Sequence, residues 1–125
     1  MRDIVAGIII TGGSGGSGVE LLRGDGTTCT LPSLPEARTY HTQAGLVACG
    51  GWNTGTSCVT FSAGAWTPSH TLAVSRNNHV SWSSYPGGVL LLGGYQYSDA
   101  KRSTELLSST SSTTTTQFGL AYDAQ

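Results

Sequence analysis

A short apolar run that ends in two glycines occurs three times along the chain. The runs occupy residues 8–13, 46–51 and 89–94, and their starts are 38 and 43 residues apart. The runs hold three or four consecutive apolar residues before Gly-Gly or Thr-Gly-Gly, and continuous apolar residues are typical of a strand that is buried on both faces. Glycines after such a strand allow a sharp exit or a close backbone approach. Each run therefore predicts a buried strand followed by a tight turn.

Further strands follow each run at matching places. A second strand is expected at residues 19–22, 58–61 and 103–107, and a third at residues 28–31, 65–67 and 114–118. The pattern Arg-x-x-His then recurs, and it leads into strands at residues 40–44 and 79–83. The prediction is an all-β fold in one domain, 1–125, with units at about 1–35, 36–75 and 76–125. Four short strands cannot bury both faces alone, so such units pack face to face around an axis.

The repeat resembles Kelch repeats, most closely those of divergent invertebrate Kelch proteins. The resemblance rests on the Gly-Gly pair at each strand end, on a period near forty residues, and on Trp66, the one tryptophan found at the Kelch position one strand pair later. The similarity covers essentially the whole chain and implies a Kelch-type β-propeller segment of about three four-stranded blades. It assigns a structural role to the residues that recur with the repeat. These are Gly12, Gly13, Gly50, Gly51, Gly93, Gly94, Arg38, His41, Arg76, His79 and Trp66.

Three blades do not make a ring, because propellers carry about 4 to 8 of them. A three-bladed chain would leave two apolar faces in water, and such faces associate. Two copies supply six blades, so we expect a homodimer that closes a six-bladed ring. The chain begins close to its first Gly-Gly strand and ends where another innermost strand would start. We therefore expect a fragment or an engineered part of a propeller that self-assembles.

The low charge of the chain excludes several classes of partner. Charged residues make up 10% of the sequence and the net charge is −1, whereas nucleic-acid-binding domains are strongly basic. No apolar stretch approaches the roughly 20 residues of a membrane helix. We expect no nucleic-acid partner, no membrane partner, no metal and no cofactor.

Three cysteines, an odd number, suggest one disulfide and one remaining thiol. Cys49 closes the apolar strand of its unit and Cys58 opens the next one, so a cross-strand disulfide between them is plausible. A bond between Cys29 and Cys49, or three buried thiols, are the alternatives. A disulfide would be consistent with an extracellular or secreted parent protein, and nothing else in the sequence indicates a compartment.

Strand parity places the loops that follow the Gly-Gly pairs, and the loops between consecutive units, at one end of the sheets. Aromatic residues and arginine are enriched at binding hot spots, and this end carries several. The candidate binding residues are Trp52, Asn53, Tyr95, Tyr97 and Arg102. The alternative interpretation is that Trp52 and Tyr95 only cover the edge of a blade.

No catalytic arrangement stands out from the sequence. His41 and His79 recur with the repeat, which favours packing over a general-base role, and residues 12–18 lack the Lys-Ser/Thr end of a phosphate loop. We expect a non-catalytic scaffold or protein-binding module. A carbohydrate-binding propeller that stacks sugars on Trp52 and Tyr95 is one alternative. The propeller part of a copper oxidase-like enzyme is the other, and it needs a Tyr, His and Cys cluster that the sequence does not place.

Overall fold

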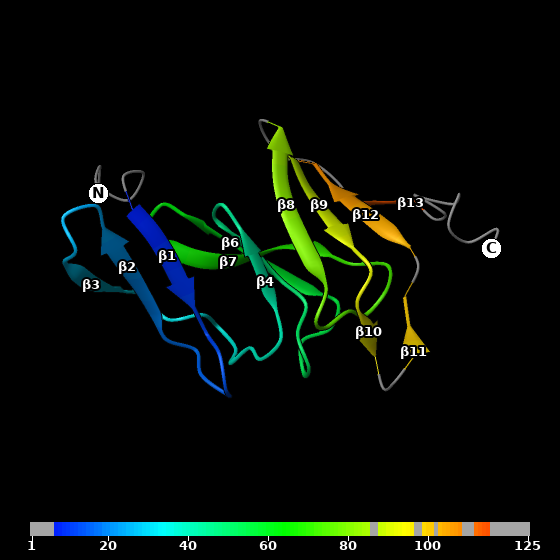
Figure 1. Ribbon diagram of the computed structural model, residues 1–125, viewed down its shortest axis with the longest axis horizontal. Helices are drawn as coiled ribbons and strands as arrows, with labels where there is room; N and C mark the ends of the chain where they lie inside the picture. Colours follow the sequence, from blue (N-terminus) through cyan, green and yellow to red (C-terminus); the bar gives the residue numbers. More distant parts are fainter. Residues whose placement is uncertain (1–6, 86–87, 97–98, 102, 109–111, 116–125) are drawn as a thin grey trace.

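The computed structural model of the chain describes residues 7–85, 88–96, 99–101, 103–108 and 112–115, and every regular element in these ranges is a β-strand (Figure 1). This confirms the all-β prediction. The first two sheets are antiparallel and are named here in chain order. Sheet I has the strand order β1 (Gly7–Thr11), β2 (Val19–Arg23), β3 (Thr28–Leu31). Sheet II has the order β4 (Thr42–Ala44), β5 (Val47–Cys49), β6 (Ser57–Ser62), β7 (Ala65–Thr71).

Sheet III repeats the arrangement of sheet II and adds a small hairpin. Its order is β8 (Val80–Tyr85), β9 (Gly88–Leu92), β12 (Thr104–Leu107), β13 (Ser112–Thr115). The hairpin, β10 (Tyr95–Gln96) with β11 (Asp99–Ala100), was not predicted. Its position depends on a long-range bridge from Asn77 to Tyr95, which no local pattern indicates. The strand expected at residues 114–118 begins at Ser112 instead, and residues beyond Thr115 lie outside the described ranges.

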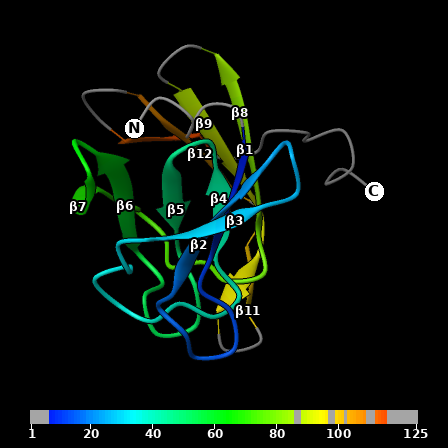
Figure 2. The same ribbon diagram turned by 90° about the vertical axis from the view of Figure 1, so that its left-hand side faces the viewer.

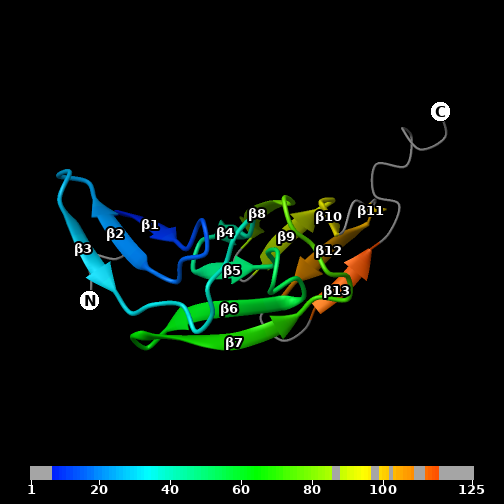
Figure 3. The ribbon, with the colours of Figure 1, turned by 90° about the horizontal axis from the view of Figure 1, so that it is seen from below.

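The three sheets stack face to face with sheet II in the middle (Figures 2 and 3). We call the face of a sheet that points toward the preceding sheet its front face and the opposite face its rear face. The junction of sheets I and II buries Val19, Leu21, Leu31, Leu34, Ala48, Val59, Phe61 and Trp66. The junction of sheets II and III buries Ala44, Cys49, Cys58, Leu72, Val89, Leu91 and Leu107. A fully buried side chain of this kind contributes about 1.5–3 kcal/mol, so these two clusters dominate the stability of the fold.

The expected two-sided burial of the apolar runs holds in sheet II, where β5 faces a neighbour on each side. It is wrong for β1, because Ile8 is 64% exposed and Ile10 is 50% exposed. Their side chains lie on the front face of sheet I, and the described part of the chain supplies no sheet on that side.

The disulfide between Cys49 and Cys58 is confirmed. The two residues are direct partners in the register of β5 and β6, and their Cα atoms are 4.1 Å apart. Cys29 is half-buried and carries a free thiol. The alternative pairing of Cys29 with Cys49 is therefore not the one found.

Candidate functional site

The loops named by the sequence gather at one end of the three sheets, the lower edge of Figure 1. This end, called the loop face here, contains the hairpin loops after β1, β5 and β9. It also contains the first link, residues 32–41, and the second link, residues 72–79, which connect consecutive sheets. The two links carry Arg38 with His41 and Arg76 with His79.

Each link is bonded backward to the Gly-Gly loop of the sheet before it. The N–H of Gly51 donates to the carbonyl of Arg76 at 2.9 Å, and the N–H of Arg76 donates to the carbonyl of Gly55 at 3.0 Å. The first link is bonded in the same way. The N–H of Gly13 donates to the carbonyl of Arg38 at 2.9 Å, and the N–H of Arg38 donates to the carbonyl of Gly16 at 3.0 Å. The loops are thus held by main-chain bonds to the links.

The first glycine of each loop allows the next sheet to come close. Gly50 has φ +71°, and a Cβ atom built on it would lie 2.6 Å from the carbonyl oxygen of Arg76 and 2.6 Å from Cε1 of His79. A Cβ on Gly12, φ +60°, would lie 2.8 Å from the corresponding atoms of Arg38 and His41. Only glycine fits at these two junctions.

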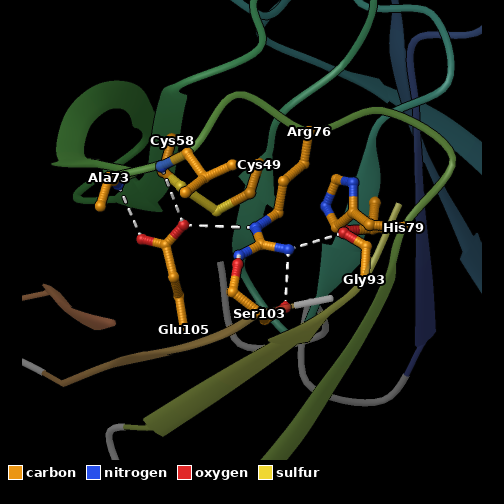
Figure 4. Close-up of polar contacts among 10 residues, drawn as sticks. Cys49, Cys58, Ala73, Arg76, His79, Gly93, Ser103 and Glu105 are labelled. Carbon is orange, nitrogen blue, oxygen red and sulfur yellow. Dashed lines mark hydrogen bonds and ion pairs between the residues drawn. A yellow bond between two sulfur atoms is a disulfide. The ribbon is translucent and has the colours of Figure 1, made fainter. Parts of the chain in front are cut away.

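Arg76 reaches forward from the second link into sheet III (Figure 4). Its Nη1 donates to the carbonyls of Gly93 at 2.6 Å and Ser103 at 2.8 Å, which are the ends of two neighbouring strands. Glu105 lies 3.2 Å from Nε of Arg76 and also accepts the N–H groups of residues 73 and 74. Both side chains of this ion pair are completely buried. Since a buried charge is costly unless it is paired and hydrogen-bonded, this arrangement fixes the link on sheet III.

Arg38 makes the equivalent contacts with sheet II but has no buried carboxylate partner; the exposed Glu36 carboxylate lies 3.8 Å from its Nη2. Its Nη1 donates to the carbonyls of Gly50 at 2.9 Å and Ser57 at 2.8 Å. Nε of Arg38 has no hydrogen-bond partner among the described atoms. Val59 occupies the position on sheet II that Glu105 occupies on sheet III, which accounts for this difference. Burial lowers the pKa of Arg38.

The two histidines lie between sheets rather than in an open pocket. His79 is 6% exposed, and its Nε2 is 2.7 Å from Oγ1 of Thr42; Nε2 of His41 is 2.8 Å from Oγ1 of Thr11. Burial, together with the charge of Arg76, lowers the pKa of His79 from its usual 6.5 to about 4. The pKa of His41 is lowered as well, first by burial. Both rings are neutral at pH 7 and link consecutive sheets through threonine hydroxyls.

Two of the candidate binding residues are exposed aromatic side chains on the loop face. Trp52 is 51% exposed and Tyr95 is 42% exposed, and Asn53 beside Trp52 is also exposed. Tyr97 and Arg102 lie outside the described residues.

Main-chain hydrogen bonds hold these aromatic residues on the links. The N–H of Trp52 donates to the carbonyl of Thr39 at 2.8 Å, and Tyr95 exchanges two 3.0 Å bonds with Asn77. Trp52 and Tyr95 each follow a Gly-Gly pair, so they have the same place in successive loops. The structure therefore brings them to one face on a fixed backbone.

Tyr40 was not among the predicted binding residues, but it is 56% exposed on the same face. Its carbonyl accepts the N–H of Asn78 at 2.9 Å, and the amide of Asn78 is 3.5 Å from the hydroxyl of Tyr95. Tyr40 has φ +60°, which costs about 1–3 kcal/mol for a bulky residue and is typical of functional sites. The only sequence signal was its place directly before His41.

A groove of about 540 Å³ opens between sheets II and III at the end opposite to the loop face. Hydroxyl groups of Thr60, Ser69 and Ser83 line it together with His70, whose Nε2 lies 2.7 Å from the carbonyl of Ser108. Within the described ranges, no three His, Cys, Asp or Glu residues are grouped as ligands for a metal ion. Nor does that part of the chain contain a helix long and apolar enough to cross a membrane.

Comparison with known proteins assigns no family. Neither a protein-family model nor a curated protein sequence matches this chain.

Proposed function

We propose that the chain is a segment of a Kelch-type β-propeller, with sheets I, II and III as three blades, and that it binds a protein partner without catalysing a reaction. Two features support the blade interpretation. The links repeat the same arginine, histidine and glycine contacts at both junctions. The first strands of sheets II and III, β4 and β8, lie side by side, as blades do around an axis (Figure 3).

The propeller proposal includes a homodimer that closes a six-bladed ring. Three blades fall below the range of about 4 to 8 found in propellers, and two copies reach it with a closed two-fold arrangement. Light scattering at micromolar concentration is expected to give twice the chain mass of 12.9 kDa. A stable monomer would contradict the ring.

The loop face carries the proposed binding function. The decisive observation is that Tyr40, Trp52 and Tyr95 are exposed together while main-chain bonds to the links hold their backbones. Exposed aromatic residues on a rigid base lose little conformational entropy when they bind, and they are frequent hot spots. A role in catalysis has less support, because the buried rings of His41 and His79 are engaged between sheets.

The test uses peptides selected from a displayed random library against the purified chain. We expect selected peptides to lose at least about tenfold in affinity, about 1.4 kcal/mol, when Trp52 and Tyr95 are both replaced by alanine. The control is Leu46→Ala, which removes an exposed apolar side chain at the opposite end of sheet II. Equal affinity for the double variant and the parent would place the site elsewhere.

A glycan array separates the protein-binding function from its carbohydrate alternative. Saccharide binding that disappears in the same double variant, with no peptide selected, would favour sugar stacking on these rings. Oxidase activity that appears with added copper and follows the purified chain would overturn the non-catalytic proposal.

A further inference from the structure

Two sheet faces of the chain are apolar and uncovered, one at each end of the stack. The front face of sheet I presents Ile8, Ile10 and Leu22 with the carboxylate of Glu20. The rear face of sheet III presents a larger apolar set. Its side chains are Val80, Trp82, Leu90, Leu92 and Leu106. Trp82 is 62% exposed and Val80 is 60% exposed.

The three sheets can be aligned by one hydrogen bond that each contains. In every sheet the first glycine of the Gly-Gly pair donates its N–H to a carbonyl at, or just before, the first residue of the next strand. The bonds are Gly12 to Gly18, Gly50 to Ser57, and Gly93 to Ser103. In this alignment Ile10 corresponds to Ala48 and Leu91, which are both completely buried.

The same alignment shows that both junctions inside the chain join a rear face to a front face. Ala48 and Val59 on the front of sheet II meet the rear of sheet I, and Leu91 and Leu107 on the front of sheet III meet the rear of sheet II. The front of sheet I and the rear of sheet III are therefore the two halves of a third junction of the same kind.

We propose that these two open faces bind each other between two copies of the chain, the front of sheet I of one copy against the rear of sheet III of the other. The inference rests on the proposed propeller and specifies its subunit contact, a head-to-tail one with a different face on each side. In a closed pair of copies the contact occurs twice and covers both apolar faces.

The carboxylate of Glu20 favours a protein surface, rather than a lipid, as the partner that covers the front face of sheet I. It occupies the same front-face position as Glu105, which is completely buried in the junction of sheets II and III and accepts two backbone N–H groups and Nε of Arg76. A carboxylate in an apolar face is costly to bury against lipid, which offers no such donors. A protein partner can supply such donors, as the backbone and Arg76 of the second link do for Glu105.

The Gly-Gly turn of sheet III differs from the other two in its described surroundings. A Cβ atom on Gly12 or Gly50 would meet the histidine at the end of the following link, His41 or His79. At Gly93, the described residues place only the carbonyl oxygen of Lys101 within 4 Å of where a Cβ atom would lie, at 3.6 Å. Among the described residues, none therefore takes the place that His41 and His79 take at the other two turns.

The test uses two charge variants and their mixture. Ile10→Glu disrupts the front of sheet I, and Trp82→Glu disrupts the rear of sheet III. Both side chains are at least half exposed in the single chain, so circular dichroism is expected to show an unchanged fold. Thr67→Glu, at an exposed position of β7, is the control for added charge.

Sedimentation velocity is expected to give a dimer for the parent and the control and a monomer for each face variant. An equimolar mixture of the two face variants is expected to form dimers again, because each supplies the intact face that the other lacks. A dimer that survives either single substitution, or a mixture that stays monomeric, would overturn the head-to-tail contact.

The outcome also separates this contact from the proposed function. A monomeric parent overturns both the contact and the ring, whereas peptide binding at the loop face can still be measured on it. If the parent instead assembles from three or more copies, while each face variant is monomeric and their mixture associates again, the contact is supported and the six-bladed ring is rejected.

Discussion

Replacing Gly94 by alanine should destabilise the fold much more than replacing Gly64, although the two residues have nearly the same backbone conformation. Their φ angles are +86° and +82°. A Cβ atom on Gly94 would lie 2.7 Å from the carbonyl oxygen of Asn77 and 2.7 Å from Cβ of His79, whereas no atom lies within 4 Å of the corresponding position at Gly64. The pair separates backbone strain from close packing.

The expected magnitudes follow from these two contributions. A left-handed conformation costs a non-glycine residue about 1–2 kcal/mol, and this applies equally to both variants. Overpacking adds about 1–3 kcal/mol, and this applies only at position 94, where one of the contacts is backbone. We expect a loss of about 1–2 kcal/mol for Gly64→Ala and about 2–5 kcal/mol for Gly94→Ala.

Urea denaturation followed by tryptophan fluorescence measures the difference, with thermal melting as a second readout. Each kcal/mol corresponds to roughly 3–5 °C in a domain of this size. Equal losses for the two variants would show that the link does not pack on the Gly-Gly turn and would contradict the close approach at this junction.

Three further outcomes are expected. The pKa of His79 in the folded state, about 4, lies below its ordinary 6.5. The neutral ring therefore stabilises the fold above pH 6.5, and this stabilisation is lost as the pH falls toward 4. The expected loss of unfolding free energy between pH 7.5 and 5 is about 2 kcal/mol. Urea titrations at several pH values should show this loss reduced in His79→Gln, and an unchanged pH profile would contradict it. Glu105→Gln should cost about 3 kcal/mol by leaving the buried Arg76 without its counter-charge, whereas Glu20→Gln, in a background that does not self-associate, should cost under about 0.5 kcal/mol; similar losses would refute the assigned ion pair. Maleimide labelling without reductant should modify one thiol per chain, Cys29, with three modified after reduction and denaturation; two or more labelled thiols in the unreduced protein would contradict the disulfide.

Local patterns predicted most strand positions but not the hairpin of β10 and β11, and they made the Cys49–Cys58 disulfide one of three open interpretations. The apolar runs that end in Gly-Gly became β1, β5 and β9, because continuous apolar residues favour strands and paired glycines permit the turn that follows. Cys49 and Cys58 flank one hairpin loop, which made their pairing plausible, and the register of β5 and β6 decided it. These features depend on residues close together in the sequence.

Burial and contact partners were decided by the tertiary structure. Glu20 and Glu105 stand in nearly identical segments, VELL and TELL, yet one is exposed and the other is completely buried. The difference arises because sheet III has a sheet in front of it, whereas none of the described strands lies in front of sheet I. The exposure of Tyr40 likewise depends on how the first link lies on the sheets. Sequence patterns specify which faces of a strand are apolar, but the element that covers each face is set by long-range packing between sheets.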